Sequence, residues 1–400
     1  MKRVLIVFGT RPEAIKLAPV VLGLRDAPGF QPVIAVTAQH RAMLTQVLEL
    51  FGLEPDLDLN IIQDRQTLTG ITTRALEGLS KGIEATGPDA IVVQGDTTTT
   101  LTGALAGFYH RVPVLHVEAG LRTGNPHSPF PEEVNRRLTS ELATLHLAPT
   151  AMSRDNLLGE NVAADRVWVT GNTVIDALLW VVSRPAPEQQ ALARLDGDRR
   201  RVLLVTAHRR ESWGSGMRSI GRALADIARS EPDLSVVFPI HRNPVVREAI
   251  LPALEGIDNV VVMEPVDYST FAHLMRRSHI LLTDSGGVQE EGPSLGKPVL
   301  VMRDTTERPE AVEAGTARLV GTDRDAIVGN VRTLLHDEAA YRAMAVAVNP
   351  YGDGEAARRT VAALAHFFGL GPAPDEFLPL GGALLPRSMP VTDRLVGTMR

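Results

Sequence analysis

The segment that decides the fold is ILLTDSGGVQEE, residues 280–291. Its first four residues are apolar enough for a strand that is buried on both faces, and the chain then turns through Ser285, Gly286 and Gly287 into a helical pattern. Two adjacent glycines let backbone N–H groups approach an anion closely, and the start of a helix adds about half a positive charge. The segment therefore predicts a strand, an anion-binding turn and a helix. An ordinary strand-to-helix turn capped by Ser285 is the alternative.

The same alternation of short apolar runs and helical patterns continues along the whole chain. Runs that are apolar on both faces and separated by helices indicate parallel sheets covered on each side, so we predict an α/β fold. The predicted helices include residues 67–85 and 326–335. The predicted strands are residues 4–8, 33–36, 90–93, 112–117, 145–148 and 167–170 in the first half, and 202–206, 235–240, 259–263, 280–283, 298–302 and 317–320 in the second.

The apolar pattern lapses once, at SRPAPEQQALARLDGDRRR, residues 183–201. Such a stretch is typical of a linker, so we predict a first domain over residues 1–182 and a second over residues 202–350. A C-terminal helix is expected within residues 351–370. Residues 371–400 are rich in Pro and Gly and lack periodicity, which predicts a tail that is disordered or loosely docked.

Composition excludes several classes of protein. The 47 acidic and 41 basic residues give a net charge of −6, and the basic residues are scattered, so nucleic acid is not an expected partner. The chain contains no cysteine and therefore no disulfide or thiolate nucleophile. The opening MKRVLIVF is followed at once by GTRPE, which predicts a first strand rather than a signal peptide. No apolar run is long enough to span a membrane, and we expect a cytoplasmic protein.

Cofactor and metal motifs are also missing from the sequence. No Gly-x-Gly-x-x-Gly follows the first strand of either half, and there is no P-loop. The 11 histidines include no His-Glu-x-x-His pair. We therefore expect neither a nicotinamide cofactor nor a catalytic metal.

Polar residues follow the predicted strands where parallel sheets bind ligands, beyond the carboxyl ends. A single residue of this kind is more often a helix cap, but six such groups favour one shared cleft. Arg11, Lys16 and Arg308 could neutralise a diphosphate at the glycine turn, although Lys16 alone would be better explained as a surface cation. Glu290 or Glu291 could hold ribose hydroxyls. The six groups begin at Arg11, Gln94-Gly95-Asp96, Glu118, His208-Arg209, His241 and Asp284.

Six stretches resemble the non-hydrolysing UDP-N-acetylglucosamine 2-epimerases. The resemblance runs in order from residue 4 to about residue 322 and does not cover the chain after residue 369. It implies the GT-B architecture, with two Rossmann-like domains, parallel sheets and UDP in the interdomain cleft, and usually a homodimer. The stretches are GTRPEAIK (9–16), QGDT (94–97), EAGLRT (118–123), PFPEEVNR (129–136), DSGGVQEE (284–291) and RDTTERPE (303–310).

The resemblance also implies a reaction and a set of residues. Loss of UDP from C1 acidifies the C2 proton, elimination gives a glycal, and re-addition yields the epimer. The implied acid and base groups are Asp96, Glu118, Glu132 and His208; Glu132 could instead be a first-turn carboxylate that stabilises its helix. The implied substrate-binding residues are Arg11, Lys16, Phe271, Ser285, Gly286, Gly287, Glu291 and Arg308.

One departure and one further site accompany the resemblance. Val266 stands where many members of the family have Gln, so base recognition is weaker or differently arranged if a side chain makes that contact. Bacterial members often carry a regulatory UDP-N-acetylglucosamine site beside the active site. Its implied residues here are Gln39, Arg65, Gln66, Arg209 and His241, and polar loops without a ligand are the alternative.

Three other functions remain compatible with the sequence. A GT-B glycosyltransferase would use the same UDP site with an external acceptor, and a hydrolysing epimerase would release UDP and free N-acetylmannosamine. A non-catalytic UDP-sugar sensor would need none of the acid and base groups. The carboxylates predicted near C2 favour the epimerase.

Overall fold

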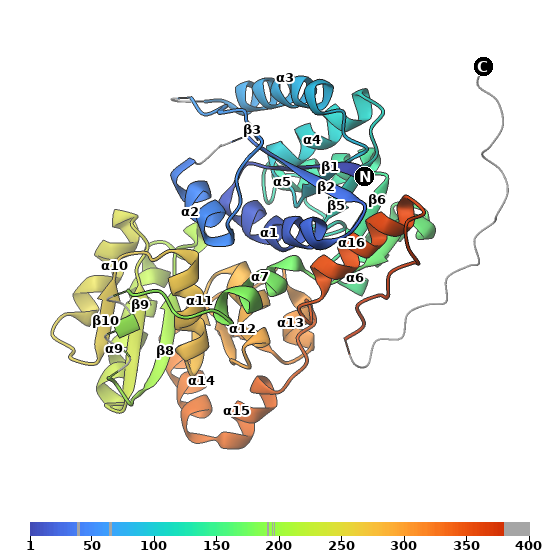
Figure 1. The fold of residues 1–400 in the computed structure, drawn as a ribbon. Coiled ribbons are helices and arrows are strands. Elements are labelled where there is room, and N and C mark those ends of the chain that lie inside the picture. Colours follow the sequence, from blue (N-terminus) through green and yellow to red (C-terminus); the bar gives the residue numbers. More distant parts are fainter. Residues whose placement is uncertain (38–40, 64–65, 190–191, 194, 196, 380–400) are drawn as a thin grey trace, which may run out of the picture. The chain divides into compact units, whose positions relative to one another are not determined.

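The structure, a computed structural model, describes residues 1–37, 41–63, 66–189, 192–193, 195 and 197–379. The chain forms two compact units, each built on its own sheet (Figure 1). The first unit contains residues 1–41, 54–171 and the chain from Ala357 onward, and the second contains residues 42–53 and 172–356. No segment of the described chain forms a helix with the length and hydropathy that a membrane span requires.

The first unit has a seven-stranded sheet in the order β3-β2-β1-β4-β5-β6-β7, with every neighbouring pair parallel. Its strands are β1 (Lys2–Phe8), β2 (Phe30–Val36), β3 (Leu57–Asp58), β4 (Ala90–Gln94), β5 (Val114–Val117), β6 (Leu145–Ala148) and β7 (Val167–Val169). Its helices are α1 (Arg11–Asp26), α3 (Leu68–Thr86), α4 (Thr98–Tyr109), α5 (Glu132–Leu142), α6 (Ala151–Gly159), α16 (Ala356–Phe367) and the 3₁₀ turn η1 (Ala164–Arg166).

The second unit has a six-stranded parallel sheet in the order β10-β9-β8-β11-β12-β13. Its strands are β8 (Arg201–Thr206), β9 (Leu234–Pro239), β10 (Val260–Met263), β11 (Ile280–Thr283), β12 (Val299–Val301) and β13 (Ala317–Leu319). Its helices are α2 (Arg41–Phe51), α7 (Thr173–Val182), α9 (Ser215–Ser230), α10 (Pro244–Leu254), α11 (Tyr268–Arg277), α12 (Gly286–Ser294), α13 (Pro309–Glu313), α14 (Arg324–His336), α15 (Glu338–Ala345) and the 3₁₀ turn η2 (Arg210–Ser212).

These orders confirm the predicted α/β class with two Rossmann-like domains. In each sheet the strand order reverses direction between two central strands, β1 and β4 in the first and β8 and β11 in the second. Ligands bind at such switch points, outside the carboxyl ends of the strands. The loops after β1, β4, β8 and β11 are therefore the places to look for a site.

Small residues bring α4 close to the first sheet. A Cβ on Gly103 would lie 2.8 Å from Val93 Cγ1, and one on Gly107 would lie 2.5 Å from Val114 Cγ2. Either side chain would force the helix outward, so these glycines fix the distance between α4 and the strands. The start of α4 is capped by Thr97, whose hydroxyl accepts a hydrogen bond from the Thr100 N–H.

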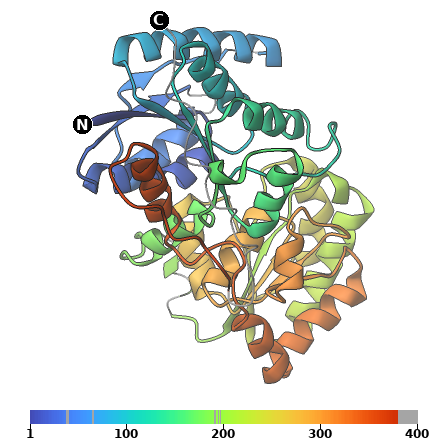
Figure 2. The same cartoon turned by 90° about the vertical axis from the view of Figure 1, so that its right-hand side faces the viewer.

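The boundary between the two units lies between Gly171 and Asn172, before α7, whereas the predicted boundary follows residue 182. Helix α7 belongs to the second unit, where it packs against α11 and α12. Its sequence is apolar along almost its whole length, and such a pattern does not indicate which of two sheets a helix covers. Helix α16 returns to the first unit and lies beside α1, with Gly23 next to Val361 (Figure 2).

Candidate active site

Glu118 lies at the carboxyl end of β5 in a left-handed backbone conformation, with φ of 63°. Its side chain is buried and is held on both sides: Lys16 Nζ lies 2.5 Å from one carboxylate oxygen, and the Gln94 amide donates to the other. The contact between the Lys16 ammonium group and this carboxylate is an ion pair. Lys16 is therefore part of this cluster, although its sequence context alone favoured a surface cation.

Asp96 follows β4 after Gly95, whose φ is 74°. Its carboxylate forms an ion pair with Arg136, and the Asn135 side chain donates to its backbone carbonyl at 2.9 Å. Both partners come from α5. The Asp96 side chain keeps 26% of its surface exposed, so it remains accessible to a ligand.

Helix α5 begins with two adjacent carboxylates that have different surroundings. Glu132 is half-buried at the first helical position, as predicted. Glu133 is fully buried and accepts hydrogen bonds from the N–H groups of Thr123 and Gly124, at 3.0 and 3.2 Å, and from Arg136 at 3.0 Å. Burial tends to raise the pKa of Glu133, but these hydrogen bonds and Arg136 outweigh it and hold the pKa below its usual range.

Two buried histidines lie behind these turns, in paired positions on neighbouring strands. His116 and His146 pair across β5 and β6, and both rings are almost fully buried. His116 Nε2 donates to the Gly95 carbonyl at 2.7 Å, which helps to hold the turn that carries Asp96. Burial lowers the pKa of His116 to about 4 and that of His146 to about 3, so both rings are neutral near pH 7.

Arg11 is the first residue of α1 and is half-buried. Its guanidinium makes no hydrogen bond or ion pair to the other residues that the structure describes. With Lys16, Asp96, Glu118 and Glu132, it completes the predicted site residues of the first unit, which come from the turns after β1, β4 and β5 and from the start of α5.

In the second unit, His208 and Asp284 follow the central strands β8 and β11. His208 Nδ1 lies 2.9 Å from the Asp284 carboxylate, which also accepts the N–H groups of His208 and Arg209 at 2.6 and 2.8 Å. Burial acts to raise the pKa of Asp284, but His208 and these hydrogen bonds bring it below its usual value. An ionised Asp284 favours a proton on Nδ1 and leaves Nε2 of His208 available for a ligand.

Gly286 opens α12 between two arginines. A Cβ at this position would lie 3.8 Å from Arg209 Nη2 and 3.8 Å from the guanidinium carbon of Arg308. Arg209 Nε is buried and has no hydrogen-bond partner among the described residues. Two guanidinium groups and a helix N-terminus therefore meet at this glycine, an arrangement suited to a phosphate group.

The remaining predicted binding residues lie on α11, α12 and the loop before α13. Arg308 forms an ion pair with the buried Glu290, and Tyr268 donates its hydroxyl to Glu291 at 2.8 Å. Burial, with Glu291 adding to it, raises the pKa of Tyr268 well above its usual value, so the phenol stays protonated as a donor. Phe271 is half-buried on α11, in the turn that follows Tyr268.

The residues predicted for a regulatory site fall into three groups. Gln39 and Arg65 lie outside the described residues. Gln66 precedes α3 and accepts a hydrogen bond from Arg74 at 3.3 Å. In the second unit, the His241 ring stacks on that of His208, with centroids 5.9 Å apart, and Arg209 adjoins Gly286 as described above. Burial lowers the pKa of His241, and the neighbouring His208 contributes to the shift.

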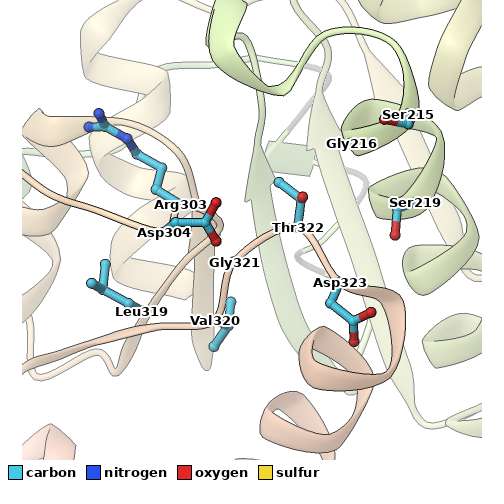
Figure 3. Close-up of a pocket in the computed structure, with 10 residues that line it drawn as sticks. All are labelled: Ser215, Gly216, Ser219, Arg303, Asp304, Leu319, Val320, Gly321, Thr322 and Asp323. Atoms are coloured by element: carbon cyan, nitrogen blue, oxygen red, sulfur yellow. The ribbon is translucent and has the colours of Figure 1, made fainter.

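A hollow of about 600 Å³ opens at the carboxyl ends of β12 and β13 (Figure 3). It is lined by hydroxyl groups of α9 and by two carboxylates, while Arg303 extends to an ion pair with Glu211. None of the predicted site residues lines it. Its lining residues are Ser215, Gly216, Ser219, Arg303, Asp304, Leu319, Val320, Gly321, Thr322 and Asp323. Among the described residues, no group of His, Asp or Glu side chains is arranged to hold a metal ion.

Comparison with known sequences shows the family to which the chain belongs. A sequence model of UDP-N-acetylglucosamine 2-epimerases matches residues 23–365. The chain belongs to the UDP-N-acetylglucosamine 2-epimerase family. It is 56% identical to the UDP-N-acetylglucosamine 2-epimerase of Escherichia coli K12 over 369 residues, which are 90% of this chain and 98% of that protein. It is also 56% identical over 375 residues to a probable UDP-N-acetylglucosamine 2-epimerase of Ralstonia nicotianae, covering 92% and 100%.

Solved structures of this epimerase family share the fold. The Neisseria meningitidis UDP-GlcNAc 2-epimerase, bound to UDP-GlcNAc, superposes with a TM-score of 0.83 at 48% identity, covering 91% of this chain and all of that one. A Listeria monocytogenes protein described as a putative UDP-N-acetylglucosamine 2-epimerase gives 0.89 at 45% identity, covering 94% and 100%. These comparisons confirm the predicted GT-B-type fold of this chain.

The sequence analysis did not single out Glu133 or Arg136, and it placed Gln94 and Asp284 at strand ends without giving them a role. Glu133, Arg136 and Gln94 hold Asp96 or Glu118 in place, and Asp284 orients His208. The spacing of Glu133 and Arg136, three residues apart on one helix face, is a signal that could have suggested their ion pair. Contacts between different strand ends have no comparable local signal.

Proposed function

We propose that this chain is an isomerase that interconverts UDP-N-acetylglucosamine and UDP-N-acetylmannosamine without net hydrolysis. The observation that carries the proposal is the pair of carboxylates at the edge of the first sheet. Asp96 and Glu118 each lie against a cation, Arg136 and Lys16 respectively, in a family named for epimerisation at C2. Carboxylates placed beside the sugar are the groups that a proton transfer at C2 requires.

The reaction proceeds through elimination and re-addition. A carboxylate removes the proton from C2, the electron pair of the C–H bond forms the C1–C2 double bond, and the C1–O bond breaks with its electrons going to UDP. The glycal is then protonated at C2 on the opposite face, and a phosphate oxygen of UDP bonds again to C1. Atoms and electrons balance without an external oxidant or reductant, in line with the expectation that no cofactor is needed.

The first unit supplies the groups that act on the sugar. Asp96 and Glu118 serve as acid and base, and Glu132 at the start of α5 is the third carboxylate of the set. His208 of the second unit, oriented by Asp284, donates to a phosphate oxygen or to a sugar hydroxyl through Nε2. Each general acid or base contributes about 10² to 10⁴ in rate.

The second unit supplies the site for UDP. The N-terminus of α12, with Ser285, Gly286 and Gly287, binds the diphosphate, and Arg308 stabilises the charge that develops as UDP leaves. Arg209 adjoins the same glycine and joins this set, in addition to the regulatory role that the resemblance implied. Glu291 holds ribose hydroxyls and Phe271 packs on the nucleoside, while Arg11 and Lys16 belong to the substrate-binding set of the first unit.

One experiment separates this reaction from the alternatives. The protein is incubated with UDP-N-acetylglucosamine in D₂O, and the sugar and nucleotide are followed by NMR. The proposal requires UDP-N-acetylmannosamine with deuterium at C2, and deuterium also entering the remaining substrate. Free N-acetylmannosamine would instead establish a hydrolysing epimerase. No change without an added acceptor would establish a glycosyltransferase or a sensor.

We also propose that the protein is a homodimer whose interface lies on helices α4 and α5. These helices pack together, and apolar side chains on them or directly before α5 are exposed: Phe108, Tyr109, Phe130, Val134 and Leu138, at 59%, 65%, 64%, 37% and 47% exposure. Val134 and Leu138 are four residues apart and so share one face of α5, and Phe130 lies just before the helix. A second copy of the chain would remove this surface from water.

We also propose a cytoplasmic location and a regulatory site for UDP-N-acetylglucosamine. The regulatory site is argued from the residues around the Gly286 turn. Arg209 and His241 adjoin the Gly286 turn and His208, so a second nucleotide sugar bound to them would act directly on the active site. The initial rate of the reverse reaction, from UDP-N-acetylmannosamine, should then rise when a small amount of UDP-N-acetylglucosamine is added. A rate that only falls, as simple product inhibition requires, would contradict the regulatory site.

A further inference from the structure

Glu13 is a buried carboxylate at the start of α1 to which the proposed reaction assigns no role. It is 2% exposed and stands at the third position of the helix. Its Oε2 accepts the backbone N–H groups of Gly9 and Thr10, at 2.9 and 2.7 Å. A glutamate at this position commonly caps its own helix from the surface, and a capping role needs neither burial nor a second oxygen.

The other oxygen of Glu13 binds a different segment of the chain. Oε1 accepts the hydroxyl groups of Thr97, directly after Asp96, and of Thr100, the latter at 3.1 Å. Thr100 Oγ1 also lies 2.6 Å from the Gln94 carbonyl. The carboxylate therefore joins the turn after β1 to the turn after β4, the two turns at the switch point of the first sheet.

The same contacts continue to Glu118. Gln94, whose carbonyl lies beside Thr100 Oγ1, donates its side-chain amide to one oxygen of Glu118. Lys16, one turn after Glu13 on α1, lies against the other oxygen. Lys16 and Gln94, the two partners of Glu118, thus belong to segments that Glu13 connects. Thr97, the residue after Asp96, is one of the donors to Glu13.

We propose that Glu13 is a positioning residue for the reaction: it fixes the turns after β1 and β4 so that Asp96, Lys16 and Glu118 keep their mutual geometry. The inference rests on the proposed roles of Asp96 and Glu118. An ionised carboxylate can accept all four donors at once. Burial raises the pKa of Glu13, against the hydrogen bonds from Thr97, Gly9 and Thr10, so placing this carboxyl group in the interior costs free energy that a surface cap would not.

Glu13→Gln tests the inference because it preserves size and removes one acceptor oxygen. The new amide group must face either two N–H donors or two hydroxyl groups that would then accept instead of donate, so the network that joins the turns is altered. We expect kcat to fall by about 10² per folded molecule, while the affinity for UDP alone, measured by calorimetry, changes less than about threefold. This split between turnover and nucleotide binding is what positioning predicts.

Thr99→Val is the matched control. Thr99 is fully buried at the start of α4, next to Thr100, and its hydroxyl bonds to Thr37 at 2.9 Å rather than to Glu13. It should lower the melting temperature and keep kcat near that of the parent. Thr100→Val removes one donor to Glu13; it should lower kcat alone but add little in the Glu13→Gln background, because both changes break one network.

The possible outcomes are distinct. A lower melting temperature with unchanged kcat in both Glu13→Gln and Thr100→Val would overturn the inference and leave Glu13 as a cap. If Glu13→Gln does not fold, Thr100→Val alone decides by the same criterion. Glu118→Gln is measured in parallel: if it retains turnover, the proposed function of the site fails, whereas loss there with normal turnover in Glu13→Gln rejects the positioning role only.

Discussion

Gly286 has room for a side chain, and this makes it a direct test of phosphate binding. The nearest atoms to a Cβ there belong to Arg209 and Arg308 at 3.8 Å, an ordinary contact distance. Gly286→Val should therefore fold normally but fill the space between the two guanidinium groups. We expect the Kd for UDP to rise at least about 30-fold, roughly 2 kcal/mol, by calorimetry.

Gly329→Val is the control for this substitution. Gly329 lies on α14 in the same unit, and a Cβ there would meet no atom within 4 Å. Its UDP affinity should match that of the parent protein. Unchanged UDP affinity in well-folded Gly286→Val would contradict the assignment of the diphosphate to the α12 turn.

The two buried histidines make stability depend on pH. His116 and His146 have folded-state pKa values of about 4 and about 3, against about 6.5 in an unfolded chain. As pH falls below about 6.5 the unfolded chain binds protons that the folded state does not, so the free energy of unfolding decreases. The loss continues until the folded-state pKa of each ring is reached.

Between pH 7 and pH 5.5 each ring should cost about 1 kcal/mol of stability. His146→Gln should therefore reduce the mean slope of unfolding free energy against pH over this window by about half a proton, whatever its effect at pH 7. Urea denaturation at several pH values measures the slope. A slope equal to that of the parent would show that His146 takes up its proton in the folded state.

For single residues, the sequence predicted which side chains lie at strand ends better than it predicted which side chains they contact. Asp96, Glu118 and His208 were placed at strand ends, because apolar runs show where strands stop. Lys16 was the weakest of the predicted cations when considered alone, yet it lies against Glu118. Its partner is more than 100 residues away along the chain, and only the order of strands in the sheet brings the two together.

Helix α5 carries Glu132 at its start, and the neighbouring Glu133 anchors the helix. Substituting Glu133 therefore tests how the helix is held. Glu133→Gln breaks a fully buried ion pair with Arg136 and weakens the bonds to Thr123 and Gly124. The free energy of unfolding should fall by about 2 kcal/mol, since Arg136 loses one of its two carboxylate partners and the N–H groups of Thr123 and Gly124 lose a charged acceptor. Turnover should fall as well, because Arg136 also holds Asp96.

The same substitution at the other end of α5 serves as the control. Glu141 is exposed, and Glu141→Gln should change the free energy of unfolding by less than about 0.5 kcal/mol and leave turnover intact. Equal effects of the two substitutions in urea denaturation would show that Glu133 does not anchor the helix.

At the scale of elements, all the long strands were predicted and β3 was not. Leu57–Asp58 has only two residues, too few to form an apolar run. The boundary between domains was predicted at the polar stretch after residue 182, whereas the units divide between Gly171 and Asn172. Local polarity marks a loop, but the packing of α7 against α11 and α12 decides which unit the helix joins.

For the whole molecule, the exposed apolar face of α5 predicts the oligomeric state. Leu138→Glu places a charge on that face, so the protein should sediment as a monomer of 43.2 kDa while the parent sediments at twice that mass. Val346→Glu, at a residue that is 76% exposed in the second unit, should leave the mass unchanged. A parent protein that is monomeric at micromolar concentration would contradict the proposed interface.

The central claim is that the edge of the first sheet performs the proton chemistry and the second unit binds UDP. Its most direct test is the rate at which Glu118→Gln protein exchanges deuterium into C2 of UDP-N-acetylglucosamine in D₂O, measured by NMR together with UDP affinity. We predict that exchange falls at least about 10²-fold while the Kd for UDP stays within about threefold of the parent value. Exchange at near the parent rate by the folded variant would contradict the account.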